Sequence, residues 1–208
     1  MLHLETVEPN TFSLLNRLMQ MPILKNFSLV GGTALSLYYG HRISVDLDLF
    51  SHEKFDKAET ITALMDEFGE DFAYDSDQLS FGIFCFIQNV KVDIVRYPHL
   101  PLFEPKEVGG LRMYMPEDIA AMKINAILGR GKKKDFWDIS ELLKHFSVAN
   151  IMQLHKQKFP NQMLLISIPH TLTYFVEADE SEDPISLKGQ TWEDIQKHIQ
   201  KAVREYLS

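Results

Sequence analysis

Cysteine is almost absent from this chain, because Cys85 is the only one among 208 residues. A disulfide within the chain is therefore excluded, and a lone thiol is typical of a protein from a reducing compartment such as the cytosol. Cys85 lies in the apolar run FGIFCFI, which predicts a buried structural cysteine rather than a catalytic thiol.

Long apolar runs are also missing. No segment approaches the roughly 20 apolar residues that span a bilayer. The first residues, MLHLETVEPN, lack the basic and then apolar pattern of a secretory signal. We therefore expect a cytoplasmic protein without a membrane partner.

An excess of basic charge is the third absence, since the formal net charge is −8. This balance argues against non-specific coating of nucleic acid. It leaves room for a local basic segment, and residues 123–134 contain no acid. The cations of that segment are Lys123, Arg130, Lys132, Lys133 and Lys134. They either grip RNA phosphates or form a solvated helix end and loop.

The histidines lack the spacing of a metal site. None of the 8 stands in an HxH or HExxH pattern, so a zinc site has little support. No Ser-His-Asp or Cys-His arrangement can be recognised either. His41, which lies between two expected elements, is predicted to be a surface or turn residue.

The composition that remains is that of an ordinary globular protein, with 45% hydrophobic and 24% charged residues. Periodicity predicts an α/β fold in which a mixed sheet with flanking helices is followed by a mainly helical half. We place the core in residues 1–100 and the helical region, which would complete the active site, in residues 101–208. A connector rich in Pro and Gly, PHLPLFEPKEVGG, follows Tyr97.

The most informative stretch runs from Ser28 to Phe50. A short strand, FSLV, leads into Gly31-Gly32, and a helix over TALSLYYG closes at Gly40. The next run, ISVDLDLF, alternates like a strand. Its apolar residues would face a core, and Ser44, Asp46 and Asp48 would share the other face.

A third aspartate lies on a later strand. LSFGIFCFI (residues 79–87) and VKVDIVRY read as two strands joined by a turn at Gln88-Asn89, and Asp93 is the acid of the second. Two carboxylates about 7 Å apart on one strand face repel each other. A divalent cation relieves this repulsion, and Mg²⁺ prefers carboxylate and phosphate oxygens. Asp46, Asp48 and Asp93 are therefore the candidate metal ligands.

The glycine pair suits a phosphate group. Glycines between a strand and a helix allow a close approach of ligand to backbone, and the helix N-terminus favours an anion. Thr33 would cap this helix or donate its hydroxyl to phosphate. The ordered combination predicts metal-assisted phosphoryl or nucleotidyl transfer.

Val30-Gly31-Gly32, Asp46-Leu47-Asp48 and Asp93 resemble the nucleotidyltransferase superfamily that includes DNA polymerase β. More narrowly, GGTALSLYYGHRISVDLDLF is similar to the AbiEii/AbiGii abortive-infection toxin family, the nucleotidyltransferase partner of type IV toxin–antitoxin pairs. The similarity extends to KINAILGRGKKKDFWDISELL, in which Lys123 and the KDFWD segment take the family's Lys and basic-Asp-x-x-Asp positions.

The resemblance implies a role for each matching residue. Asp46 and Asp48 would hold Mg²⁺ or Mn²⁺, and Asp93 would be a third ligand or the base for the attacking hydroxyl. Gly31, Gly32 and Thr33 would contact the triphosphate.

Three further positions have a functional and a structural interpretation, and a fourth, Asp138, would orient a neighbouring cation. Lys123 would pair with phosphate or be an exposed helix lysine, and Asp135 would complete the site or interact with its helix dipole. Asp138, one turn on, would orient Lys123 or Arg130. Ser44 would touch the nucleotide or face solvent.

The expected function is transfer of NMP from an NTP to an acceptor hydroxyl, with release of pyrophosphate. In the family's terms the acceptor is a tRNA 3′ end or another RNA, and an antitoxin protein restrains the enzyme. Two alternatives remain open at this stage: a protein AMP-transferase, and a non-catalytic module that binds a nucleotide or a partner on the same fold.

Overall fold

The structure is a computed structural model, and it describes residues 2–74, 81–129 and 131–208. Its strands are β1 Ser28–Val30, β2 Leu47–Ser51, β3 Phe72–Tyr74, β4 Gly82–Ile87, β5 Val90–Arg96, β6 Lys106–Val108 and β7 Leu111–Met113. Its α-helices are α1 Pro9–Gln20, α2 Gly31–Tyr39, α3 Lys57–Phe68, α4 Pro116–Gly129, α5 Lys133–Leu142, α6 Val148–Lys158, α7 Ile168–Thr173, α8 Val176–Asp179 and α9 Trp192–Leu207. Short 3-10 turns cover Leu4–Thr6, Pro22–Leu24 and Gly69–Asp71.

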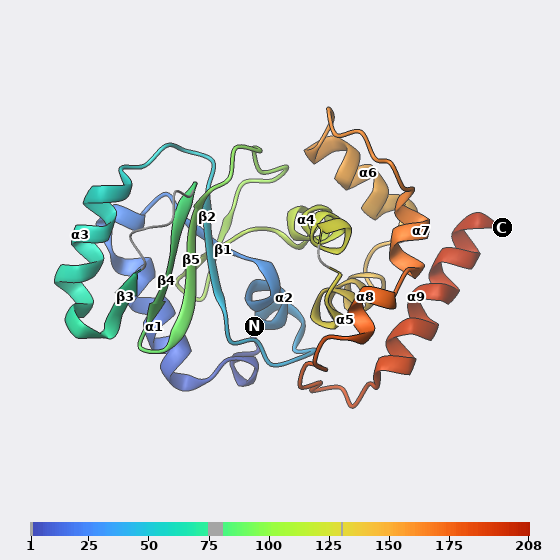
Figure 1. The fold of residues 1–208 in the computed structure, drawn as a ribbon, viewed down its shortest axis with the longest axis horizontal. Coiled ribbons are helices and arrows are strands. Elements are labelled where there is room, and N and C mark those ends of the chain that lie inside the picture. The colour runs from blue at the N-terminus through green and yellow to red at the C-terminus, as the bar shows by residue number, and fades with distance from the viewer. Residues whose placement is uncertain (1, 75–80, 130) are drawn as a thin grey trace.

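The strands form one mixed sheet in the order β3-β4-β5-β2-β1-β7-β6. At its centre β2 pairs parallel with β5 and antiparallel with β1. Seen edge-on in Figure 1, the sheet has α1 and α3 on one side, and α2 followed by the C-terminal helices on the other. The expected mixed sheet with flanking helices is confirmed.

Strand alternation separates a core face from a polar face. On β2, Leu47 and Leu49 are buried, and on β4 so are Ile83, Cys85 and Ile87. These side chains belong to the same apolar core as α1 and α3. The buried, structural reading of Cys85 is therefore confirmed. The opposite face of the central strands carries Asp48 and Asp93, and it is the side on which α2 lies.

The predicted hairpin is confirmed in detail, because Gln88 and Asn89 both have positive φ, 52° and 63°, as a two-residue turn of this hand requires. The predicted strand over residues 43–50 is wrong in its first half, since β2 begins at Leu47. Within residues 43–46, Ser44 is buried and Val45 is 57% exposed, the reverse of the expected alternation.

Residues 106–113 are a second difference from the sequence analysis. The predicted connector contains β6, which forms a hairpin with β7 and joins the sheet beside β1. The first two residues of the predicted strand 79–87, 79 and 80, lie outside the described residues, and β4 begins at Gly82. The boundary between residues 100 and 101 stays a prediction.

The helical half packs around α4, which contacts α2, α5, α6 and α7. Lys133 begins α5, and its buried residues meet α9 through Phe136, Trp137 and Trp192. In the part of the chain that the structure describes, no helix is long and apolar enough to cross a bilayer.

Candidate active site

Asp48 and Asp93 lie side by side on the polar face of the sheet. They are register partners on the parallel strands β2 and β5, whose backbones are about 4.8 Å apart. Burial raises the pKa of Asp48, and the charge of Asp93 raises it further. Two carboxylates at one register position with no hydrogen bond between them form an electrostatically costly pair.

Gly31 and Gly32 connect this pair to a second cluster. Gly31 has φ +73° and lies so close to the Asp48 carboxylate that a Cβ atom would overlap Oδ2. A Cβ atom on Gly32 would overlap the guanidinium of Arg42. The glycines thus admit two charged side chains against the start of α2, and a side chain at either position would displace them.

Asp46 faces a different neighbour from Asp48. Its Oδ2 accepts a hydrogen bond of 2.8 Å from Lys134 Nζ at the start of α5. Burial opposes ionisation of Asp46, but Lys134 outweighs it and holds the pKa below its ordinary value. Both residues line a cavity of about 490 Å³ that also includes Arg42, Ser44 and Lys132.

Asp93 is held by a second lysine. Lys91 Nζ lies 2.5 Å from Asp93 Oδ2. The other oxygen, Oδ1, is buried and has no hydrogen-bond partner among the described residues. Two of the three predicted metal-binding carboxylates, Asp46 and Asp93, are therefore paired with lysine ammonium groups.

The residues present fit a divalent cation in part. The unpartnered Oδ1 of Asp93, the raised pKa of Asp48 and the all-oxygen donors suit Mg²⁺ or Mn²⁺. However, no group of three His, Cys, Asp or Glu in residues 2–74, 81–129 and 131–208 is already arranged to hold a metal ion. Asp46 would have to leave Lys134 to complete the set.

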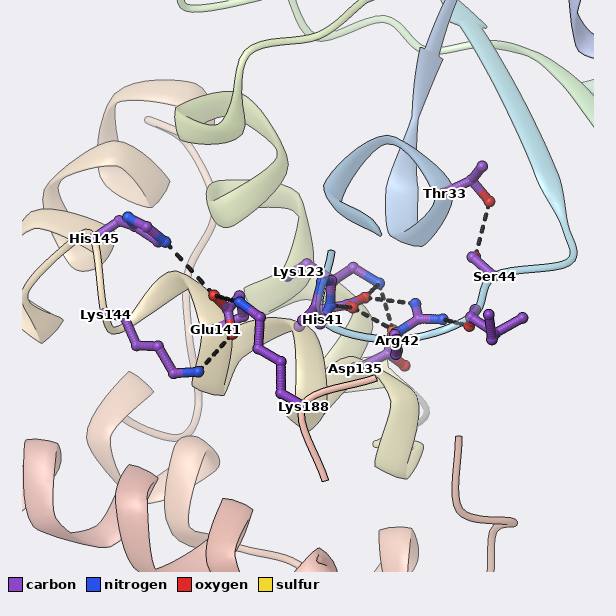
Figure 2. A network of polar contacts seen from close by, with 12 residues as sticks. Thr33, His41, Arg42, Ser44, Lys123, Asp135, Glu141, Lys144, His145 and Lys188 are labelled. Carbon is purple, nitrogen blue, oxygen red and sulfur yellow. Dashed lines mark hydrogen bonds and ion pairs between the residues drawn. The ribbon is translucent and has the colours of Figure 1, made fainter. Parts of the chain in front are cut away.

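Next to these carboxylates lies a buried charge cluster, which consists of His41, Arg42, Lys123, Asp135 and Asp138. Figure 2 labels the first four of these residues. The cluster joins the loop after α2 to α4 and α5. All five side chains are buried, so each charge depends on its partners for stabilisation.

Asp138 is the centre of the buried charge cluster. Arg42 binds it through two hydrogen bonds, Nε to Oδ1 at 2.8 Å and Nη2 to Oδ2 at 3.0 Å. His41 Nε2 is 2.8 Å from Oδ1, and Lys123 Nζ is 2.6 Å from Oδ2. Although burial opposes ionisation, Arg42 and Lys123 hold the pKa of Asp138 well below its usual range.

Lys123 completes the cluster with a hydrogen bond of 2.9 Å from Nζ to Asp135 Oδ1. Burial disfavours its charge, but Asp135 and Asp138 raise the pKa of Lys123 above the ordinary value. The predicted contact between Asp138 and Lys123 is confirmed, while Arg130 lies outside the described residues. Lys123 is not the exposed helix lysine of the structural alternative, because it is 6% exposed.

The structure brings Asp46, Asp48 and Asp93 to one edge of the cluster that contains Lys123 and Asp135. The charge of Lys123 acts on Asp48, and the charges of Asp46 and Asp135 act on Arg42. Nucleotide and metal binding by these residues stays a prediction.

The hydroxyl groups of Thr33 and Ser44 make hydrogen bonds within the protein. The Thr33 hydroxyl is directed at Ser44 Oγ, 2.8 Å away, and at the carbonyl oxygen of Asp46, as Figure 2 shows for the first pair. Both residues are buried. In this conformation they fasten the loop before β2 to α2, and the solvent-facing alternative for Ser44 is wrong.

His41 is the clearest correction. His41 was predicted to be a surface or turn residue, but it is 0% exposed and contacts Asp138. Arg42 and the counterion roles of Lys91 and Lys134 were not expected. The only local signal for Arg42 is its position four residues before Asp46, where a cation can compensate the acidic strand.

Asp48→Asn is expected to raise the Tm of the metal-free protein, and the gain should grow with pH. The folded protein retains the Asp48 proton above the ordinary pKa of about 3.9. The cost of the carboxylate is therefore absent below about pH 4 and develops as the pH rises through the folded pKa. Thermal unfolding of both proteins in EDTA from pH 4 to 7 tests this. A difference in Tm that shrinks as the pH rises would contradict it.

One family model matches most of the chain. The family model described as "Nucleotidyl transferase AbiEii toxin, Type IV TA system" matches residues 13–207. An uncharacterized protein of Aquifex aeolicus, aq_aa25, is 33% identical over 201 residues, which is 93% of this chain and 94% of that protein.

Two solved structures share the fold at low identity. JHP933 from Helicobacter pylori matches with a TM-score of 0.56 and 17% identity over 96% of this chain and 92% of its own. The antibiotic-resistance factor ANT(2'')-Ia matches with a TM-score of 0.53 and 13% identity over 71% of this chain and 89% of its own. With its mixed sheet and adjacent aspartates, this chain has the nucleotidyltransferase fold and belongs to the AbiEii family of nucleotidyl transferase toxins of type IV toxin–antitoxin systems.

Proposed function

We propose that this protein is a Mg²⁺-dependent nucleotidyltransferase that transfers NMP from an NTP to a hydroxyl of an RNA acceptor such as a tRNA 3′ end. The observation that carries the proposal is the in-register pair of Asp48 and Asp93, with Asp46 just before it. A carboxylate pair that is costly without a ligand is explained by a cation that binds between its members.

The chain's own residues define the steps. Asp48 and Asp93, joined by Asp46, would hold the cation, which when bound neutralises the triphosphate and polarises the α-phosphate. Lys134, released from Asp46, would pair with the triphosphate at the start of α2. The acceptor oxygen forms a bond to the α-phosphorus. The bond from that phosphorus to the oxygen between the α- and β-phosphorus atoms breaks, and pyrophosphate leaves. Asp93 accepts the proton of the acceptor hydroxyl.

The buried charge cluster would act on the phosphates electrostatically, while its cations stay bound to carboxylates. Arg42 and Lys123 add two fixed positive charges on the side of Gly32, and Asp135 and Asp138 hold them in place. The formal charges of these four residues cancel, so the cluster would act through the fixed orientation of its charges, with the Arg42 guanidinium beside Gly32. Charges that are already fixed in place cost no reorganisation when negative charge develops on the phosphates.

The acceptor is identified by labelling. Purified protein would be incubated with each of the four α-labelled NTPs, total RNA and cell lysate, in Mg²⁺ or in EDTA. We expect label in RNA, in Mg²⁺ only. Label in protein would favour an AMP-transferase, and metal-dependent NTP binding without transfer would favour a non-catalytic module. The family also predicts an antitoxin partner, which should reduce transfer when it is added.

Lys132→Ala is expected to weaken RNA binding and to reduce its salt slope by about 1, because one phosphate contact releases about one counterion. Lys132 is exposed and lines the 490 Å³ cavity, whereas Lys133 is paired with Asp183 at 2.7 Å. Fluorescence anisotropy with RNA at several salt concentrations measures the slope. Lys197→Ala, a lysine on α9 paired with Glu193, is the matched control. An unchanged slope for Lys132→Ala would show that this segment does not grip RNA.

A further inference from the structure

Two phenylalanines continue the row of catalytic carboxylates across the sheet. Asp48 on β2 is the register partner of Asp93 on β5, and Asp93 is the register partner of Phe84 on β4. The next row pairs Lys91 with Phe86. Register partners point to the same face of a sheet, so these side chains share the polar face. Neighbouring strands are about 4.8 Å apart, which places the aromatic rings within one nucleotide's reach of Asp93.

The aromatic surface is accessible. Phe86 is 53% exposed, and Phe81, which packs edge-to-face on Phe84 with ring centroids 5.6 Å apart, is 73% exposed. Phe84, Phe86, Lys91 and Asp93 line a cavity of about 560 Å³. Burial of such apolar rings against solvent is favourable, so their exposure beside reacting groups indicates a surface that is covered by a ligand.

This cavity is distinct from the one beside Asp46. The cavities of about 560 and 490 Å³ have no lining residue in common. The second contains Arg42, Lys132 and Lys134 together with the carboxylates of Asp46, Glu180, Glu182 and Asp183, and Lys134 is the residue proposed to pair with a triphosphate there. The first contains aromatic rings with Lys91 and Asp93. Asp46 lines the charged cavity and Asp93 lines the aromatic one, so the carboxylates lie between two cavities of different chemistry, as a transfer between two substrates requires.

We propose that Phe84, Phe86 and Lys91 bind the single-stranded 3′ end of the RNA acceptor, with bases stacked on the phenylalanine rings and a phosphate on Lys91. The inference rests on the proposed function and specifies where its second substrate binds. Aromatic rings combined with a cation are the usual means of binding single strands, because every base has a face that can stack. Lys91 is bound to Asp93 at 2.5 Å here. A cation at Asp93 would release it for a phosphate.

The surface formed by Phe84, Phe86 and Lys91 is called the platform below. Phe86→Ala tests it by a binding measurement that requires no turnover. Anisotropy would measure the affinity of the full chain, in Mg²⁺, for a short single-stranded RNA and for a blunt RNA duplex. One lost stacking contact contributes about 1–3 kcal/mol, so the single strand should bind about 5- to 150-fold more weakly. The affinity for the duplex should change little. Phe103→Ala is the matched control, because Phe103 is 48% exposed and lies in the segment before β6, outside this cavity.

The kinetic arm separates this proposal from the proposed function. Phe86→Ala and Phe84→Leu should raise the KM for RNA and leave the KM for NTP unchanged. Transfer to RNA with an unchanged KM in both variants would overturn the platform and leave the proposed function standing. Failure of the wild-type protein to bind single-stranded RNA would also overturn it. If wild-type protein transfers to no acceptor, the proposed function is wrong, and the binding arm still decides the platform.

Phe86→Trp is the conservative variant and should restore single-strand binding, because indole stacks at least as well as phenyl. A Trp variant that folds but binds as weakly as the Ala variant would contradict stacking. If Phe86→Ala instead abolishes transfer to a protein acceptor and leaves RNA affinity at the wild-type value, the occupant is a polypeptide and the proposal is wrong.

Discussion

Asp48→Asn and Asp93→Asn should each lower the rate of nucleotidyl transfer by about 10³-fold or more while the protein remains folded. An amide retains the size of the carboxylate but loses the charge that holds a divalent cation. Stabilisation of transition-state charge by a metal amounts to several kcal/mol, and about 4 kcal/mol corresponds to 10³ in rate. Single-turnover transfer of labelled NMP at saturating Mg²⁺ measures the loss.

A matched control and a stability measurement separate this effect from misfolding. Asp66→Asn changes an exposed carboxylate on α3, far from the polar face, and should transfer at the wild-type rate. Asp48→Asn should also be at least as stable as the wild type, because the repulsion from Asp93 is gone. Retention of more than about a tenth of the activity in both Asn variants would show that this pair does not hold the reacting metal.

Asp138→Ala should have the largest effect on stability, a loss of about 3–5 kcal/mol in the free energy of unfolding. Without the carboxylate, Arg42 and Lys123 lose a charge partner while both are buried. For a chain of this length the loss corresponds to a fall in Tm of about 6–20 °C. Urea unfolding and thermal unfolding both measure it.

The control for Asp138→Ala is the removal of a solvent-exposed ion pair. Glu193→Ala removes the partner of Lys197, both of which are exposed on α9, and should leave the Tm close to the wild-type value. The stability of the wild type should also fall in acid, because a carboxyl group whose pKa is depressed by folding stabilises the fold above its ordinary pKa of about 3.9 and loses that contribution as the pH falls. A small loss in the free energy of unfolding of Asp138→Ala would contradict this prediction, and would mean that the cluster relaxes toward solvent.

Local patterns predicted the elements that depend on neighbours in sequence. The turn at Gln88-Asn89 and the alternation around Asp93 involve residues two or three apart, so period and turn chemistry were sufficient. Helix α2 ends where its pattern predicts, because Gly40 closes it in the left-handed conformation. These signals require no knowledge of tertiary contacts.

The failures occur where distant contacts decide. The segment before Asp46 alternates like a strand, but hydrogen bonds from Thr33 and to Thr6 turn it into a loop. His41 and Arg42 are buried by Asp138, about a hundred positions later, which no local window contains. Strands β6 and β7 each have 3 residues and lie among glycines, so their pattern is too short to recognise.

The candidate site follows the same division. Asp46, Asp48, Asp93 and the glycine pair could be named from spacing alone, because a carboxylate in an apolar strand is costly and demands an explanation. The lysines that bind Asp46 and Asp93 could not, since Lys91 and Lys134 resemble ordinary surface residues in sequence. The aromatic row was likewise visible only after β4 and β5 were placed in register.

The central claim is that the Asp48–Asp93 pair supports metal-dependent transfer from an NTP. Its most direct test is pyrophosphate release by the purified protein, with all four NTPs and RNA present, as Mg²⁺ is titrated from zero in EDTA-treated samples. The account predicts no release without the cation, a saturable rise with Mg²⁺, and no rise for Asp48→Asn. Release that is unaffected by EDTA, or equal in Asp48→Asn, would contradict it.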